Sequence, residues 1–250
     1  MVKRVQQEAA FVLHRRPFSE SSLLVDLFSS SYGRLVVIAK GARRLKSKHR
    51  GLLHPFSPLL VSWAGKGQLP TLTAAEISGL THPLAGESLM CGFYLNELVV
   101  RLLHRDDPHQ ALFTAYRETI ERLSTSDDNE LSLRRFEITL LRELGYGLVL
   151  DAEAGSGDPL DPDQLYDYIP GHGPRVISDP EKGTIVVHGA TLLAMDKADF
   201  FDSKTMIEGK RLLREMIDRH LEGRPFHSRR LFHDVYRKND RKAATKGERS

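Results

Sequence analysis

The sequence predicts a two-domain α+β protein, with a β-rich first part and a mainly α-helical second part. Short runs rich in β-branched residues alternate with glycine-containing turns up to about residue 80. Beyond that point the apolar residues recur at helical spacing, and the charge of the chain changes sign. We therefore predict a β domain over residues 1–80, a helical domain over 81–238, and a disordered polar tail over 239–250.

Five short segments predict the strands of the first domain. Turn signals separate them, most clearly Tyr32-Gly33 and Gly65-Lys66-Gly67. Pro55 and Pro58 place the fourth segment at an edge or a bend. Five short strands with glycine-rich turns favour a small barrel or a sandwich. The predicted strands cover residues 9–16, 23–28, 34–39, 52–63 and 68–77.

Helical periodicity predicts the elements of the second domain. Pro108 suits a first helical turn, and Gly145 suits the end of a helix. An acidic stretch rich in proline and glycine, residues 151–183, is predicted to be an irregular insertion, followed by a short strand at 184–188. The predicted helices cover residues 86–105, 108–123, 131–144 and 203–221.

Composition limits the class of protein. The 250 residues are 40% hydrophobic, enough for a buried core, but no run approaches the roughly 18 apolar residues of a membrane helix. The first ten residues lack the apolar region of a signal peptide. The single cysteine, Cys91, excludes an internal disulfide and a cysteine-rich zinc site. These features predict a cytoplasmic protein without membrane contact.

Charge is distributed unevenly along the chain. Residues 1–80 hold 12 lysines and arginines against 4 acids, residues 81–200 hold 10 against 21, and residues 201–250 hold 14 against 8. The net charges of the three parts are therefore +8, −11 and +6. A basic first part followed by an acidic second part indicates a polyanionic partner for the first domain.

The strongest candidate site is a basic run that joins two predicted strands. It has six cations and no acid, and glycines at both ends let the backbone approach a ligand. Six phosphate contacts would give a log–log salt slope of about −5. The alternative is a solvated, flexible loop. The predicted DNA ligands are these six and the neighbouring Arg34: Arg34, Lys40, Arg43, Arg44, Lys46, Lys48 and Arg50.

Other basic and aromatic residues surround this run in the sequence. Arg15 and Arg16 add positive charge. Four aromatic residues could stack on bases, although each also suits a core position better. They are Phe18, Tyr32, Phe56 and Trp63.

Several motifs are distributed along most of the chain. The first domain carries AKGARR at 39–44, then Pro55-Phe56 and Pro58, and a hairpin that contains Gly67, Leu72 and Glu76. The second carries YLNELVVRLL at 94–103, LRRFEITLLRELGYG at 133–147 and SRRLF at 228–232. Each motif alone would be weak, but the arrangement as a whole is specific, and it resembles the RecO family of DNA repair proteins.

The resemblance implies an N-terminal OB-fold barrel and a C-terminal helical domain. It also implies binding of single- and double-stranded DNA, annealing of complementary strands, and recognition of the C-terminal tail of single-stranded DNA-binding protein (SSB). With RecR, and in some organisms RecF, such proteins help to load RecA onto SSB-coated DNA. The expected location is the cytoplasm, in association with the nucleoid, and the expected activity is non-catalytic.

This chain departs from the many RecO proteins that carry a four-cysteine zinc site after the LGYG motif. The corresponding segment here, LVLDAEAGSGDPLDPDQ, contains no cysteine. We therefore predict no structural zinc and no other cofactor. Five acids of this region could suggest Ca²⁺ or Mg²⁺, but they lack the order of an EF-hand, which favours a plain acidic loop. They are Asp151, Glu153, Asp158, Asp161 and Asp163.

A basic pair in the third predicted helix is the candidate site for the SSB tail. Arg134 and Arg135 lie among apolar residues, which suits an acidic peptide with a hydrophobic end, and Arg134 is the better candidate of the two. The alternative is that they pair with Glu130 or Glu137 on the surface. A further basic set near the C-terminus is either a second DNA contact or a solubilising tail. Its members are Arg229, Arg230, Arg237, Lys238, Arg241 and Lys242.

Two other classes of function remain open from the residues alone. One is an RNA-binding module with the same barrel, and the other is a nuclease that uses the acidic middle with Mg²⁺. The sequence contains no Walker A, GxSxG, HExxH or paired-carboxylate signature, so no motif indicates catalysis. The prediction is a protein that is not an enzyme and has no catalytic residues.

Overall fold

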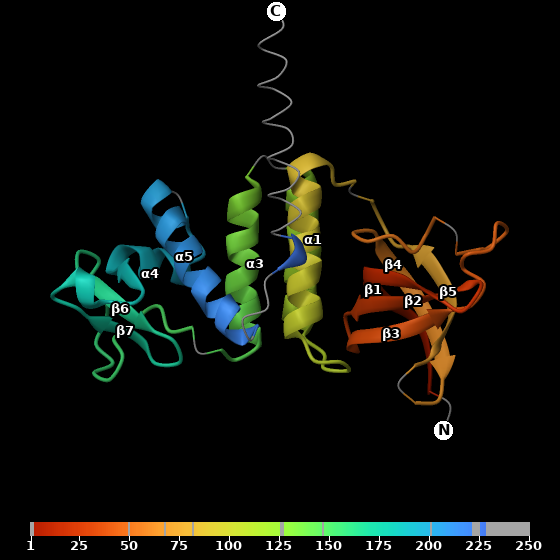
Figure 1. Ribbon diagram of the computed structural model, residues 1–250, viewed down its shortest axis with the longest axis horizontal. Helices are drawn as coiled ribbons and strands as arrows, with labels where there is room; N and C mark the ends of the chain where they lie inside the picture. Colours follow the sequence, from red (N-terminus) through yellow and green to blue (C-terminus); the bar gives the residue numbers. More distant parts are fainter. Residues whose placement is uncertain are drawn as a thin grey trace, which may run out of the picture. The chain divides into compact units, whose positions relative to one another are not determined.

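The computed structural model describes residues 3–49, 51–67, 69–81, 83–125, 128–146, 148–200, 202–221 and 226–228. Its contacts group the chain into two compact units (Figure 1). The first contains Met1–Asp127 and Pro225–Ser250, and the second contains Asp128–Arg224. The predicted division after residue 80 stays a prediction, and each unit is described here by itself.

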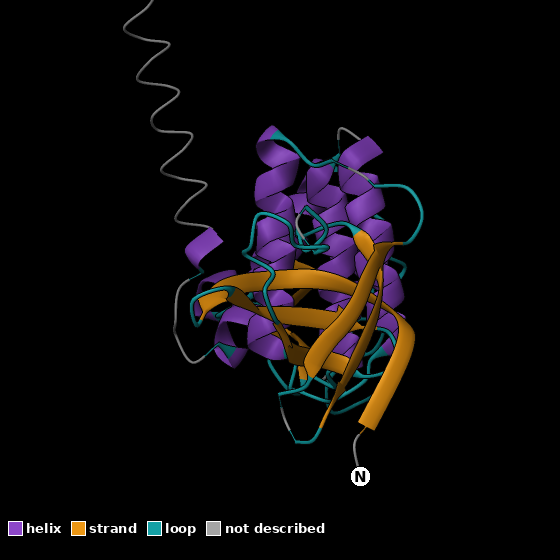
Figure 2. Cartoon of the chain, turned by 90° about the vertical axis from the view of Figure 1, so that its right-hand side faces the viewer, coloured by secondary structure: helices purple, strands orange, loops and turns teal. Residues whose placement is uncertain are grey.

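The first unit is built on a closed five-stranded barrel (Figure 2). Its strand order, β1-β2-β3-β5-β4, is that of an OB-fold, as the family resemblance implied. The fourth strand begins at Pro58, the second proline of its segment. Proline cannot donate to the ladder of the sheet, and the first position of a strand tolerates it. The strands are β1 (Lys3–Phe18), β2 (Ser22–Ser29), β3 (Gly33–Ala39), β4 (Pro58–Gly65) and β5 (Thr71–Ile77).

The long first strand lets the barrel close. β1 pairs with β4 along its first part and with β2 along its second, and its register shifts between Val5 and Glu8 and between Val12 and His14. Such bulges increase strand bending and twist. The barrel is also closed between β3 and β5, where the paired region of these two strands is short: it consists of the parallel pair of Ile38 and Thr71. Residues such as Val12, Leu27, Val37, Leu59 and Trp63 fill the interior.

Two helices pack against the outside of this barrel. They are α1 (Gly86–Leu102) and α2 (Gln110–Thr125). Phe11 and Phe28 of the barrel meet Phe113 and Tyr116 of α2, with ring centroids 5.0 to 5.8 Å apart. This aromatic cluster joins α2 to the barrel.

A buried polar chain crosses the same interface. Asn96 Nδ2 donates to the backbone oxygen of Leu13 at 2.8 Å, and the Tyr116 hydroxyl donates to Asn96 Oδ1 at 2.5 Å. Burial raises the pKa of Tyr116 far above its ordinary value, so the phenol stays protonated. The chain satisfies polar groups that would otherwise be costly to bury.

Two glycines mark the closest approaches in this unit. Gly33 has a φ of +64°, and a Cβ there would lie 2.0 Å from the backbone oxygen of Asp107. On α1, a Cβ at Gly92 would lie 2.9 Å from the ring of Phe56. The Pro55-Phe56 motif therefore serves to dock the loop before β4 on α1.

The second unit combines three helices with a small sheet. The helices are α3 (Asn129–Glu143), α4 (Gly189–Asp196) and α5 (Ser203–His220). As predicted, Gly145 follows the end of α3 with a φ of +70°, and its N–H donates to Arg142 O while that of Tyr146 donates to Leu141 O. These two bonds form a Schellman cap.

The stretch 151–183 is not irregular throughout, so that part of the prediction was wrong. It contains β6 (Leu165–Ile169), β7 (Gly173–Val176) and the short 3₁₀ helix η1 (Pro180–Lys182), and the sheet order is β7-β6-β8 with β8 (Val186–His188). Tyr166 and Tyr168 of β6 are buried. The abundant proline and glycine of the stretch masked the alternating pattern of this five-residue strand, which pairs with the following β7 and with β8.

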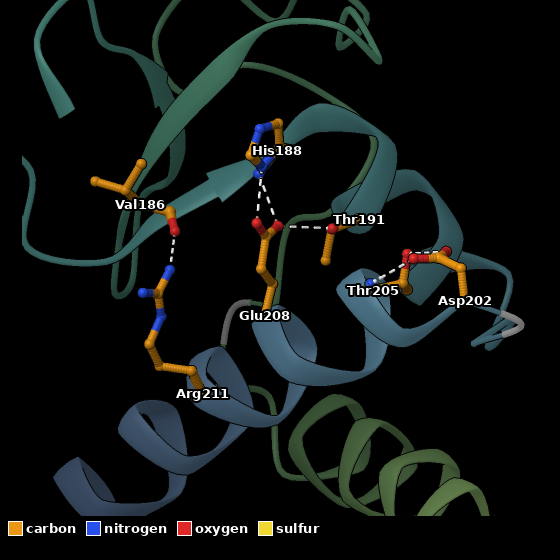
Figure 3. Close-up of polar contacts among 7 residues, drawn as sticks. All are labelled: Val186, His188, Thr191, Asp202, Thr205, Glu208 and Arg211. Atoms are coloured by element: carbon orange, nitrogen blue, oxygen red, sulfur yellow. Dashed lines mark hydrogen bonds and ion pairs between the residues drawn. The ribbon is translucent and has the colours of Figure 1, made fainter.

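Glu208 of α5 bonds to His188 at the end of β8 and to Thr191 in the first turn of α4 (Figure 3). Its carboxylate accepts from the His188 N–H at 3.1 Å and from the Thr191 hydroxyl at 2.7 Å, and it pairs with His188 Nδ1 at 2.7 Å. His188 is the N-cap position of α4 and makes no side-chain cap bond. An acid from another helix therefore caps α4. Arg211, one turn further along α5, donates to the Val186 carbonyl of β8.

We expect Glu208→Gln to lower the thermal stability of the second unit at neutral pH and to weaken its acid sensitivity. Burial alone would raise the pKa of Glu208, but the bonds from His188 and Thr191 together hold it below the ordinary value of 4.5. A carboxylate whose pKa is lower in the folded than in the unfolded state stabilises the fold at pH values above its unfolded-state pKa. This stabilisation is lost as the pH falls through the folded-state pKa.

Thermal unfolding of both forms between pH 7 and about pH 3 measures this contribution. The difference in Tm between wild type and Glu208→Gln should shrink as the pH falls below about 4.5. Glu215→Gln, on an exposed position of the same helix, is the control and should follow the wild type. A constant Tm difference across this range would contradict the assignment.

Candidate nucleic-acid interface

The basic run lies in the connection between β3 and β4, residues 40–57, and a series of turns shapes it. Backbone bonds run from Ala42 N to Ala39 O, from Arg44 N to Gly41 O at 3.1 Å and from Ser47 N to Arg44 O at 3.0 Å. Gly41 has a φ of +66°, which explains the glycine at the first turn. The run is therefore a structured loop rather than an extended linker.

Apolar and polar anchors hold both ends of this loop on the barrel. Ala42 and Leu53 are buried with the barrel core. The Arg43 N–H donates to Ser21 O at 2.9 Å, and Lys48 Nζ donates to Thr73 O at 2.8 Å. The loop thus reaches from the β1–β2 hairpin on one side to β5 on the other.

The cations of the described part of the loop are exposed residues. Arg43 also donates from Nη1 to the carbonyls of Ser19 and Glu20, at 3.3 and 3.2 Å, which holds its guanidinium over the hairpin. Arg50 lies outside the described residues. The exposed cations are Lys40, Arg43, Arg44, Lys46 and Lys48.

Arg34 does not share this exposure. Its Nε and Nη2 donate to the two carboxylate oxygens of Asp26 at 3.1 and 2.9 Å, and both side chains are only 14% exposed. Nη1 donates to Val100 O and Leu103 O at the end of α1. Because this guanidinium links β3 to β2 and α1, we remove Arg34 from the proposed DNA contacts.

Most of the candidate stacking aromatics are also structural. Trp63 and Phe56 are buried at 3% and 7% exposure, and Tyr32 packs against Trp63 with centroids 5.2 Å apart. Phe18, at the end of β1, is exposed. Arg15 and Arg16 are exposed on the same strand.

His49 lies at the base of the loop. It is 5% exposed, and within the described part of the chain its Nδ1 has no hydrogen-bond partner. Burial, aided by the charge of Lys48, holds its pKa below the ordinary value of 6.5. His49 is therefore neutral at pH 7 and serves as packing rather than as a seventh cation.

In the second unit, Arg134 and Arg135 occupy different environments. Arg134 is buried at 6% exposure, and its Nη2 donates to Glu137 Oε1 at 3.0 Å. Glu137 is itself 1% exposed, so this pair lies in the interior rather than on the surface. Arg135 is half-buried, and its Nε donates to Ala198 O at 3.1 Å. Glu130 pairs instead with Lys210 of α5.

An anchor on α1 escaped the sequence reasoning. Glu97 accepts from the N–H groups of His227 and Ser228 at 2.9 and 2.8 Å and from the Ser228 hydroxyl at 2.7 Å. Phe226 is 2% exposed and packs on Tyr94, with centroids 5.2 Å apart. Residues 226–228 therefore return to the first unit. The basic set that follows, and the predicted tail 239–250, lie outside the described residues.

The acids of the 151–163 stretch serve its turns. Glu153 Oε2 accepts from the Ser156 hydroxyl at 3.2 Å, and Asp161 Oδ1 accepts from the Asp163 N–H at 3.0 Å. Over the residues that the structure covers, no group of three or more histidine, cysteine or acidic side chains is arranged to hold a metal ion. In the same part of the chain, no helix has the length and apolar character needed to cross a membrane.

Comparisons with known proteins agree over almost the whole chain. The family model for the N-terminal domain of recombination protein O matches residues 1–80, and that for its C-terminal domain matches residues 84–230. Proteins named DNA repair protein RecO are similar along nearly their full length. That of Aromatoleum aromaticum is 47% identical over 93% of this chain and 97% of its own. That of Methylococcus capsulatus is 47% identical over 92% and 93%, and that of Coxiella burnetii is 44% identical over 92% and 99%.

Proposed function

The chain belongs to the RecO family of DNA repair proteins, and from this premise we propose that it is a non-catalytic recombination mediator. It binds single- and double-stranded DNA, anneals complementary strands and, with RecR and in some organisms RecF, promotes loading of RecA on SSB-coated DNA. It works in the cytoplasm, in association with the nucleoid.

The observation that carries this proposal is the exposed, anchored set of cations on the β3–β4 loop. All five are exposed, although Arg43 and Lys48 also donate to backbone carbonyls of the hairpin and of β5. No acid from residue 40 to residue 50 offsets their charge. Phosphate contacts of this kind bind without reading sequence. A mediator needs this property, because gaps occur at any sequence.

Annealing follows from the same field. A strand held by its phosphates keeps its base edges free, and the cations around it reduce the repulsion of a second strand. Base pairing supplies the free energy, so no nucleotide hydrolysis is required. We propose that the SSB tail binds the second unit near Arg135, with Arg134 supporting that helix from the interior.

The proposal predicts faster annealing of complementary strands coated with SSB, and the effect should depend on the SSB tail. The test compares annealing rates on strands coated with intact SSB and with SSB that lacks its C-terminal residues. We expect acceleration of at least about tenfold with intact SSB and little with the tailless form. Equal acceleration on both would contradict recruitment through the tail, and none on either would contradict the mediator role.

A further inference from the structure

The basic loop carries an exposed apolar side chain among its cations. Leu45 lies between Arg44 and Lys46 and is 81% exposed, the highest value among the large exposed hydrophobic residues of the described chain. An apolar side chain in water forgoes the free energy that burial would provide. A single such residue needs no explanation by itself, but its place inside the candidate phosphate-binding loop makes its surroundings informative.

A second exposed apolar residue lies at the structure to which this loop is tied. Phe18 ends β1 at the β1–β2 hairpin and is 39% exposed. The hydrogen bonds from Arg43 to Ser19, Glu20 and Ser21 hold the loop against that hairpin, two residues before Leu45. Phe18 and Leu45 therefore both lie within two residues of the bonds that join the basic loop to the hairpin.

We propose that Leu45, together with Phe18, contacts the bases of single-stranded DNA while the flanking cations hold its phosphates. This inference rests on the proposed DNA binding and deepens it, because it assigns a base contact to a surface so far argued only from phosphate. Apolar side chains on DNA-binding surfaces pack against base faces or insert between base steps. The bases of an unpaired strand offer such faces, and the strand's charge complements Arg44 and Lys46.

The same contact distinguishes the two forms of DNA. In a duplex the base faces are covered by their stacking neighbours, and reaching them costs a few kcal/mol per unstacked step. Phosphate contacts do not carry that cost. Leu45 therefore favours unpaired over paired strands, whereas the cations of the loop bind both.

The test compares binding of an oligothymidine with binding of a strand of equal length and charge whose residues are abasic. We expect Leu45→Ala to weaken oligothymidine binding about 3- to 10-fold and to leave binding of the abasic strand unchanged, since about 1.4 kcal/mol corresponds to tenfold. The salt slope should stay that of the wild type, because no cation is lost. Leu80→Ala is the matched control: Leu80 is 79% exposed and lies outside the loop.

The possible outcomes distinguish failure of the base contact from failure of the proposed DNA binding. Selective loss on oligothymidine by Leu45→Ala, absent in Leu80→Ala, supports the base contact. Equal affinity of the wild type for both strands, with no effect of Leu45→Ala, overturns the base contact and leaves the phosphate-binding role intact. Failure of the wild type to bind either strand overturns the proposed function itself.

Discussion

Replacing Lys40, Arg43, Arg44 and Lys46 together with alanine is expected to weaken binding of single-stranded DNA about 10²- to 10³-fold near 0.1 M salt. Each phosphate contact contributes about 0.7 to the slope of log affinity against log salt for a single strand and about 0.9 for a duplex. Loss of four contacts should flatten the slope by about 3 in the first case and by about 3.6 in the second. Titrations at several salt concentrations measure both quantities.

The control variant removes the same charge from the other unit. Arg175, Lys182, Lys204 and Arg219 are exposed there, so their joint replacement lowers the net charge equally. Its slope should stay close to that of the wild type. If the two quadruple variants lose affinity equally, the loop is not the main phosphate contact and binding follows overall charge alone. Circular dichroism establishes that both variants keep the fold.

Replacing Arg134 with alanine is expected to destabilise the second unit by about 3–5 kcal/mol. The substitution removes Arg134 from its ion pair with the buried Glu137 carboxylate, and breaking a buried ion pair costs more than losing a surface contact. For a protein of this size the loss corresponds to a fall in Tm of about 6–20 °C. Thermal and urea unfolding measure it.

A double variant tests the cause of this loss. Arg134→Met with Glu137→Leu removes both charges and keeps much of the volume, so it should recover most of the stability. Arg135→Ala, which removes only a half-buried donor to Ala198 O, should cost much less. A stability change of under about 1 kcal/mol for Arg134→Ala would contradict the buried pair and return Arg134 to the set of surface cations.

The different burial of Arg134 and Arg135 decides which variant tests the SSB-tail site. A fall in peptide affinity after Arg134→Ala is ambiguous, because the supporting helix is weakened at the same time. Arg135→Ala is the cleaner variant, provided that its unfolding curve matches the wild type. Loss of tail binding in a stably folded Arg135→Ala protein would support the proposed location of the tail.

Local patterns sufficed for much of the fold. Five β-rich segments, the Tyr32-Gly33 turn and the Gly145 cap were predicted because alternation, positive φ and helix termination are encoded by neighbouring residues. The short strand β6 was missed, because its partners β7 and β8 supply the pairing that stabilises it. A five-residue strand carries too little local signal against the surrounding prolines and glycines.

The sequence by itself determined the barrel strands, the helical period of the second half, and the run of cations without a compensating acid. Only the tertiary structure decided which cations remain in water. In the sequence, Arg34 and Arg134 resemble Arg43, yet Asp26 and the end of α1 bind the first, and Glu137 binds the second in the interior. Glu97 likewise meets Ser228 across 131 positions. Burial depends on such distant contacts, which no local pattern contains.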